Sequence, residues 1–567
     1  MRRYQRAFAE LIAAAAGLEP DAVESLIKIP EPGRGDFSLP CFPFAKALRK
    51  SPAAVAAGIV AALPADERFE ASEAVGPYIN GRLAAGSFVA SQLEEIRALG
   101  SRFAAGSAGQ GQWVVVEFSS PNIAKPLGFH HLRSTMIGNA LARIHHALGY
   151  EVVTINFLGD WGKTFGLLAA AFERFGDPAR LEERGISYLL DLYLEANRLV
   201  ERDSAFDEEA RAMFRRQEQG ELRALELWRR FREISLTEFQ RVYDRLHVVF
   251  DHVEGESRYR DELDAVIEEV GRTAGTRLDQ GALVIDMEYG PNEPPLMLRK
   301  SDGATLYATR DIAAARDRFA RFAFVKSLYV VGVEQRQHFD LLVRALAAMG
   351  CEWAARVIHV SFGRVQGMST RRGNVVFLDE VLDEARERAR AKMLEGEGER
   401  DIDIDAVSEA VGIGGVVFGD LKNLLSSDYT FDWEDILNPR GFTGICVQYA
   451  HARCCSILRK AGGAPDRADT ALLVAPEEIA LVKELARIPG AVEDAASDLE
   501  PARLARAVYE AARAWNRFQQ AGNADRHLRV LVDDEALRAA RLVLVDAVRI
   551  ALLRGLDLLG VSAPTAM

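Results

Sequence analysis

A segment between Trp113 and Thr135 places the strongest constraint on how this chain can fold. It begins with an apolar run, passes through a turn rich in Ser, Pro and Asn, and enters a helical pattern near His130. A strand that leads through a turn into a helix presents backbone N–H groups and the helix dipole to an anion. Lys125, His130 and His131 add cationic or proton-donating groups. The segment therefore predicts a phosphate-binding loop in an α/β domain.

Short apolar runs alternate with helical patterns downstream of this loop. We expect strands at 113–118, 151–157, 328–331 and 357–362, and helices at 134–148 and 339–349. This alternation predicts a doubly wound parallel sheet of the Rossmann type, with its ligand at the carboxyl ends of the strands. A charged helical insertion is expected at about 184–272, and a strand-rich stretch near 283–300.

Two further regions flank the predicted α/β domain. The predicted domains are an α+β domain at 1–103, the catalytic domain at 112–431 and an all-α helical bundle at 432–567. Helical periodicity at 4–16 and 52–62, and a strand-like run at 74–83, define the first of these. A Gly-rich linker at 106–111 follows it. The expected fold class is a multidomain α/β protein.

Net charge, cysteine content and apolar runs argue against several classes of protein. The chain has 567 residues, a net charge of −13 and five cysteines. The negative charge argues against indiscriminate nucleic-acid binding, although local basic patches remain compatible with RNA. The scattered cysteines form no CxxC pair, so we expect neither a structural zinc nor a disulfide framework. No apolar run is long enough for a membrane span, and a cytoplasmic location is expected.

Five ordered sequence blocks carry a resemblance to a known family. They are Ser120-Pro-Asn-Ile-Ala-Lys-Pro126, Asn156-Phe-Leu-Gly-Asp-Trp-Gly162, Leu306-Tyr-Ala-Thr-Arg-Asp-Ile312, Gly367-Met-Ser-Thr-Arg-Arg-Gly-Asn374 and Gln448-Tyr-Ala-His-Ala-Arg453. With them the chain resembles the arginyl-tRNA synthetases, a class I family, over nearly its whole length. The resemblance implies a monomer that uses ATP with Mg²⁺, arginine and tRNA(Arg). It also implies that the first domain binds the tRNA elbow and the helical bundle the anticodon.

The resemblance also implies roles for individual residues. The implied catalytic residues are Lys125, His130, His131, Arg371 and Arg372. The implied ATP-binding residues are Gly128, His130, His131, His338, Met368 and Ser369. The implied arginine-binding residues are Glu117, Ser120, Asn122, Tyr307, Asp311 and Gln335. Carboxylates suit a guanidinium ligand, and Tyr307 and Asp311 share one helix face because they lie four residues apart. Without the resemblance, Asp311 would equally suit an ion pair with Arg310, and His338 a helix cap.

One motif departs from the family pattern. Gly128-Phe129-His130-His131 stands where the family has histidine, any residue, glycine and histidine. The first histidine stabilises charge on the α-phosphate, and loss of such a donor costs roughly 100- to 1,000-fold in rate. The departure leaves two alternatives to a tRNA(Arg) ligase. One is a paralogue that activates arginine or an analogue for another acceptor, and the other is a catalytically weak regulator that binds tRNA or arginine.

Overall fold

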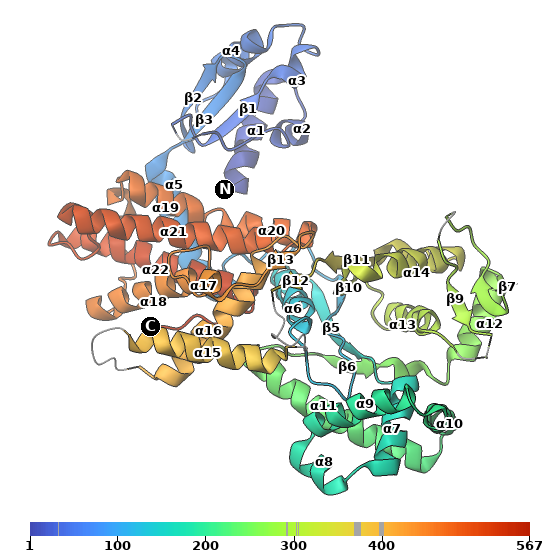
Figure 1. Cartoon of the computed structure of the whole chain (residues 1–567). Helices are drawn as coiled ribbons and strands as arrows, with labels where there is room; N and C mark the ends of the chain where they lie inside the picture. Colours follow the sequence, from blue (N-terminus) through green and yellow to red (C-terminus); the bar gives the residue numbers. More distant parts are fainter. Residues whose placement is uncertain (32, 291–292, 302, 304, 368–375, 396–401) are drawn as a thin grey trace.

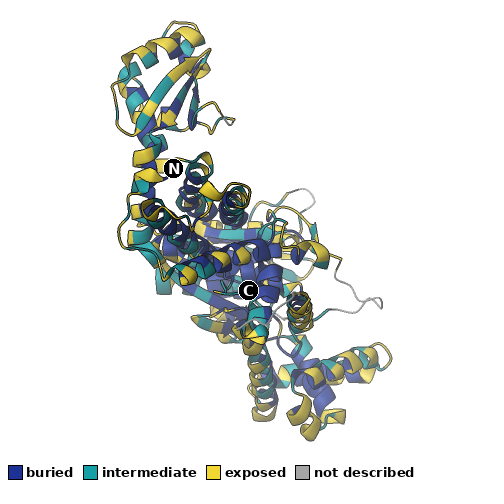
Figure 2. Ribbon diagram, turned by 90° about the vertical axis from the view of Figure 1, so that its left-hand side faces the viewer, coloured by how far each residue is buried: buried dark blue, intermediate teal, exposed yellow. Residues whose placement is uncertain are grey.

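The computed structural model describes residues 1–567 except 32, 291–292, 302, 304, 368–375 and 396–401. An N-terminal α+β body, a central α/β body and a C-terminal helical body follow one another along the chain (Figure 1). Buried residues concentrate in the middle of the molecule, whereas the N-terminal body and the helices at the opposite end show mainly exposed faces (Figure 2).

The N-terminal body is an antiparallel sheet, in the order β1-β3-β2, that packs against helices. Its elements are α1 (Arg2–Ala16), α2 (Pro20–Glu24), β1 (Phe37–Pro40), α3 (Phe42–Ala45), α4 (Pro52–Ala62), β2 (Phe69–Val75) and β3 (Tyr78–Leu83). The single strand expected at 74–83 is instead the end of β2, a turn and β3. Gly76 has a φ of 58° at that turn, a conformation that glycine adopts without strain. The helix α5 (Ala85–Leu99) leads into the central body.

The central body contains a parallel sheet in the order β11-β10-β4-β5-β6. Its strands are β4 (Trp113–Glu117), β5 (Glu151–Leu158), β6 (His252–Gly255), β10 (Lys326–Gly332) and β11 (Val357–Phe362). The strands that follow β4 in sequence, β5 and β6, lie on one side of it, and the later strands β10 and β11 lie on its other side. Ligands of such sheets bind at this switch point, at the carboxyl ends of β4 and β10.

Helices cover both faces of the sheet. They include α6 (His131–Ala147), α13 (Tyr307–Phe322) and α14 (Arg336–Ala348), and α12 (Leu263–Thr273) packs against α13. Along β4, Val114 and Val116 pack on the side of α6, while Val115 packs on the side of α13 and α14. All three side chains are fully buried, as expected for a parallel strand covered on both faces. The predicted doubly wound fold is confirmed.

The helical insertion has an apolar core of its own. It consists of α7 (Lys163–Phe175), α8 (Pro178–Arg184), α9 (Ile186–Val200), α10 (Ser204–Glu218) and α11 (Leu222–Arg245). The segment expected as insertion, 184–272, also contains β6 of the central sheet; four residues are too few to show a strand period. After α12, the antiparallel strands β7 (Thr276–Asp279), β8 (Ala282–Ile285) and β9 (Met297–Arg299) form a small separate sheet.

Asp160 joins the insertion to the central sheet. Its buried carboxylate accepts hydrogen bonds of 2.9 and 2.8 Å from the N–H and hydroxyl groups of Ser257 and lies 3.2 Å from Arg232 Nε in α11. The indole N–H of Trp228, also in α11, donates to the Asp160 carbonyl oxygen at 2.7 Å. Burial raises the pKa of Asp160, and these partners oppose that shift.

The C-terminal body is helical and packs on the α6 side of the sheet. It contains α15 (Leu378–Leu394), α16 (Ile404–Leu421), α17 (Trp433–Ile436), α18 (Gly444–Ala461), α19 (Pro476–Leu485), α20 (Ile488–Ser497), α21 (Ala502–Ala524) and α22 (Glu535–Leu558). Two short parallel strands, β12 (Val365–Gln366) and β13 (Tyr429–Thr430), connect it to the end of the central sheet. Their pairing forms a ribbon beside the switch point.

Candidate active site

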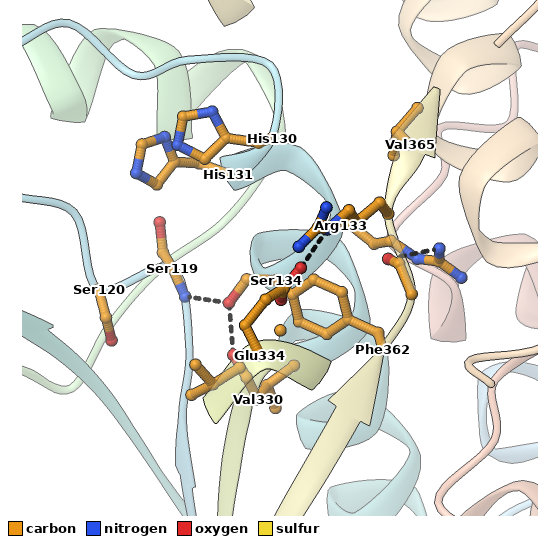
Figure 3. Close-up of a pocket in the computed structure, with 14 residues that line it drawn as sticks. Ser119, Ser120, His130, His131, Arg133, Ser134, Val330, Glu334, Phe362 and Val365 are labelled. Carbon is orange, nitrogen blue, oxygen red and sulfur yellow. Dashed lines mark hydrogen bonds and ion pairs between the residues drawn. The ribbon is translucent and has the colours of Figure 1, made fainter. Parts of the chain in front are cut away.

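A cavity of about 430 Å³ opens at the switch point of the sheet (Figure 3). It lies between the N-terminus of α6, the end of β10 and the residues that follow β11. Its lining residues are Ser119, Ser120, His130, His131, Arg133, Ser134, Val330, Val331, Gly332, Glu334, Phe362, Gly363, Arg364 and Val365. The structure thus places the phosphate loop predicted from sequence at a ligand-sized cavity.

Two histidines stand at the start of α6 beside this cavity. The rings of His130 and His131 lie 4.0 Å apart between centroids, and Figure 3 shows them next to Ser119. The Nδ1 atom of His131 lies 3.0 Å from the backbone nitrogen of Gly128, which fixes the ring. Burial and the neighbouring His130 lower the pKa of His131 to about 3, and burial lowers the pKa of His130. Neutral imidazoles are hydrogen-bond partners rather than cations at neutral pH.

The loop after β4 is held in an unusual backbone conformation. Ser119 and Ser120 have φ values of 69° and 46°, a region that residues other than glycine seldom adopt. The N–H of Ser119 donates to Ser134 Oγ at 3.0 Å, and the N–H of Ser120 donates to Asn156 Oδ1 at 3.2 Å. The buried hydroxyl of Ser120 has no hydrogen-bond partner among the described residues. Since Ser120 also lines the cavity, this hydroxyl is a candidate hydrogen-bonding group for a ligand.

A second cavity of about 230 Å³ adjoins the first, and Glu334 lines both. Tyr307, Gln335 and His338 line this smaller cavity. The Nε2 atom of His338 lies 2.6 Å from Asp311 Oδ2, and its ring packs edge-on against Tyr307 with centroids 4.8 Å apart. Four of the sequence-predicted residues are therefore brought together at one place.

Two other predicted arginine-binding residues lie on the β4 side. Glu117 ends β4 and is buried, with Oε2 2.5 Å from Arg318 Nη1. Burial raises the pKa of Glu117, the Arg318 guanidinium lowers it, and Asp311 raises it. Asn122 forms a backbone bridge to Gly159. A Cβ atom at Gly159 would lie 2.0 Å from Asn122 Oδ1, so glycine is required there for the amide to occupy its position.

Lys125 does not line the larger cavity. Its Nζ atom lies 3.9 Å from the centre of the Tyr193 ring in α9. In this structure Lys125 therefore contacts the helical insertion.

Met368, Ser369, Arg371 and Arg372 lie outside the described residues. The described residues that follow this segment, Val376 and Phe377, contact the loop that precedes α6. The N–H of Phe129 donates to the Val376 carbonyl at 2.9 Å, and Gly128 pairs with Phe377. The residues that follow this segment therefore contact the phosphate loop.

Sequence reasoning missed Arg133, Ser134, Glu334 and Arg364, which line the larger cavity. Arg133 and Ser134 follow the two histidines within one helical turn, and that spacing is the signal that points to them. Arg364 and Glu334 form an ion pair between the segments that follow β11 and β10. Each comes just after a strand of the parallel sheet, where ligand-binding side chains gather.

The comparisons with known proteins agree with this geometry. Family models match residues 94–433 (tRNA synthetases class I (R), catalytic domain), 447–567 (DALR anticodon binding domain) and 2–83 (arginyl tRNA synthetase N terminal domain). The arginine–tRNA ligase of Lactococcus lactis subsp. cremoris is 42% identical, covering 94% of both chains. That of Streptococcus pyogenes serotype M4 is 41% identical over 98% of both.

A solved structure gives the same assignment. Arginyl-tRNA synthetase from Thermus thermophilus superposes with a TM-score of 0.83 at 29% identity, covering 99% of this chain and all of that one. Among the described residues, no helix combines the length and apolarity needed to cross a membrane. The N-terminal, catalytic and anticodon-binding models match successive parts of this one chain, and the larger cavity lies within the catalytic match. The chain therefore belongs to the arginyl-tRNA synthetases, a family of class I aminoacyl-tRNA ligases.

Proposed function

We propose that this chain attaches arginine to tRNA(Arg) through an arginyl-adenylate formed in the two adjoining cavities. The observation that carries this proposal is their arrangement: a cavity at the start of α6 meets, at Glu334, a smaller one beside the carboxylate of Asp311. The first suits a nucleotide, because the helix N-terminus favours an anion. The second suits a guanidinium side chain.

ATP, as its Mg²⁺ complex, occupies the larger cavity in this proposal. His130 and His131 donate hydrogen bonds to the phosphates, and Gly128 lets the chain pass close to the nucleotide. His338 contacts the nucleotide from the smaller cavity. Lys125 supplies a positive charge by leaving Tyr193. Met368, Ser369, Arg371 and Arg372 are proposed to complete the phosphate side, with the two arginines as donors.

Arginine occupies the smaller cavity. Its guanidinium is bound by Asp311 and Glu117, and Tyr307, which is 53% exposed, covers the side chain. Asn122, Ser120 and Gln335 bind the amino-acid end. Because His338 now holds Asp311 at 2.6 Å, substrate arginine must displace that imidazole.

The reaction has two steps. An oxygen of the arginine carboxylate attacks the α-phosphorus of ATP, and pyrophosphate leaves. The ribose hydroxyl at the tRNA 3′ end then attacks the arginyl carbonyl carbon, and AMP leaves. Neither step needs a covalent protein nucleophile, so the site acts by alignment and by hydrogen bonds to developing charge.

Both outer bodies offer surfaces for tRNA. In the N-terminal body, exposed Phe42 packs against exposed Tyr78 with ring centroids 5.9 Å apart, and the lysines that follow in sequence, Lys46 and Lys50, are also exposed. Aromatic and basic side chains together are typical of nucleic-acid contacts, and we assign this surface to the tRNA elbow. We assign the helical bundle to the anticodon, and propose that the protein acts as a monomer in the cytoplasm.

ATP–pyrophosphate exchange and tRNA charging, each with and without arginine and tRNA(Arg), test the proposal. We expect both activities, and we expect Asp311→Asn to raise the KM for arginine about 10- to 100-fold, the worth of a charged hydrogen bond. Asp317→Asn is the matched control, because Asp317 lies on the same helix but pairs with Arg321.

Each alternative function gives a different pattern. Exchange without charging would support a paralogue with another acceptor, and the tRNA(Arg) ligase would be refuted. Binding of tRNA with neither activity would support the regulator.

A further inference from the structure

Helix α13 presents one stripe of side chains to the candidate arginine site. Tyr307, Asp311 and Arg318 lie at positions i, i+4 and i+11, which fall on the same helix face. Ala314, between them, is buried and contributes only a methyl group. The stripe therefore runs from the exposed Tyr307, through Asp311, whose carboxylate is proposed to bind the substrate, to the buried Arg318.

Arg318 is a buried cation in unusual surroundings. Its side chain is 0% exposed, and its guanidinium lies between the rings of Phe157 and Tyr329, at 5.1 and 5.2 Å from their centres. None of its side-chain nitrogens makes an aligned hydrogen bond to a described residue. Its close partner is Glu117, which faces Tyr329 in the β4–β10 register. A buried charge lowers the stability of the fold unless it is well paired, so the presence of the Arg318 guanidinium at this place needs an explanation.

Glu117 has two carboxylate oxygens with different surroundings. Oε2 is buried and faces Arg318 at 2.5 Å. Oε1 is not among the buried unpartnered atoms, and no described hydrogen bond ends on it. One oxygen is thus held by the protein, while the other remains for a ligand.

We propose that Arg318 is a positioning residue for arginine recognition: it holds Glu117 through Oε2 and keeps it charged, so that Oε1 binds the substrate guanidinium. This inference rests on the proposed role of Glu117 in the substrate site. Arg318 itself does not touch the substrate. It supplies the internal cation that a site with two facing carboxylates requires.

The charge balance around Glu117 supports this role. The charged and titratable groups that face it are Arg318 and Asp311 on α13, Glu254 on β6 and Tyr329 on β10. Burial raises the pKa of Glu117, Asp311 and Glu254 raise it further, and Arg318 lowers it. Without Arg318 the carboxyl would take up a proton at higher pH. A protonated carboxyl loses the charge-assisted hydrogen bond to a guanidinium.

The test compares Arg318→Met and Arg318→Lys with Arg321→Met, a matched control. Arg321 lies one turn further along α13 and pairs with Glu254 at 2.6 Å and Asp317 at 3.0 Å. The KM values for arginine and for ATP are measured by exchange in the presence of tRNA(Arg), from about pH 6.5 to about pH 8.5. We expect R318M to raise the KM for arginine about 10- to 100-fold, with an increasing effect toward low pH. The KM for ATP should stay within about twofold.

R318K retains the charge and should recover part of the affinity, and R321M should leave both KM values unchanged. Equal changes in the two KM values of R318M, or an unaltered pH profile, would refute the proposal. If R318M does not fold, R318K tests the proposal in its place. In that case R318K must raise the KM for arginine several-fold and leave the KM for ATP unchanged. Glu117→Gln distinguishes a failure of the proposed arginine site from a failure of the role proposed for Arg318. An unchanged KM for arginine in E117Q would refute the proposed site, whereas an effect in E117Q but none at Arg318 would refute only this inference.

Discussion

Replacement of Arg133 by methionine should destabilise the protein in a pH-dependent way. Arg133 is fully buried and donates to the carbonyl oxygens of Gly363 at 2.9 Å, Ser427 at 3.1 Å and Leu424 at 3.2 Å. Its Nε atom lies 3.6 Å from the buried carboxylate of Asp420 in α16. The side chain thus joins α6 to the β12–β13 ribbon. Removal of one partner from a buried ion pair costs about 3–5 kcal/mol.

The pKa of Asp420 sets the pH dependence. Burial raises this pKa from 3.8 to about 6, against the attraction of Arg133. Because the folded-state pKa is the higher one, Asp420 weakens the native protein progressively as the pH rises from 3.8 to about 6. Without Arg133 the pKa rises further, and the loss continues above pH 6. Each pH unit by which the pKa rises above 6 costs about 1.4 kcal/mol at high pH, which adds up to at most about 3 kcal/mol by pH 8 and almost nothing at pH 5.

Urea unfolding of parent and Arg133→Met protein at about pH 5 and about pH 8 measures this difference. We expect the free energy of unfolding to fall by up to about 3 kcal/mol more at the higher pH. Measured against D420N, the double variant R133M/D420N should lose the same amount at both pH values, because neither protein has a carboxyl to titrate at position 420. An equal loss for R133M at the two pH values would show that Asp420 is not the source, and the argument would fail.

Three further changes test other parts of the structure. Gly128→His with His130→Gly restores the usual order of the signature motif, and we expect pyrophosphate exchange to accelerate about 100-fold; no gain would show that the native His130 already serves the phosphates as well as a histidine at position 128 does. Burial raises the pKa of Glu256 from 4.5 to about 7, so the parent should lose roughly 3 kcal/mol of stability as pH rises through that window. Glu256→Gln should remove this contribution in urea unfolding and leave only the slope below about pH 6 that Asp420 causes; an unchanged slope between about pH 6 and about pH 7 would place its origin elsewhere. In Gly138→Ala the new methyl group would lie 2.2 Å from Phe118 Cβ, and we expect a loss of about 1–3 kcal/mol; an unaltered urea midpoint would contradict the close packing of α6.

Regular elements were predictable wherever a period repeats several times. The helix at 52–62 and the strand at 357–362 have the bounds that their patterns predicted. The strand at 252–255 was not predictable, because four residues between helical stretches show no period, and its partner in β5 lies about a hundred residues away. Local pattern carries no information on such a pairing.

The candidate site was predictable in its loops but not in its buried charges. The motif containing His130 and His131 pointed to the cavity that they now line. Arg133 and Arg318 looked like ordinary polar positions of helices, since a sequence does not show that a guanidinium is enclosed on every side. The contact of Lys125 with Tyr193 likewise depends on how the insertion packs against the loop.

The position of Asp160 has a consequence for protein engineering. The helical insertion looks like a module that could be excised, because it has its own apolar core. Yet its α11 supplies Arg232 and Trp228 to an aspartate at the edge of the sheet. Trimming the chain between α7 and β6 would strip that aspartate of its cation and expose the strand ends next to the catalytic crevice. A minimal version of this enzyme must therefore keep α11, or replace Asp160 with a neutral residue.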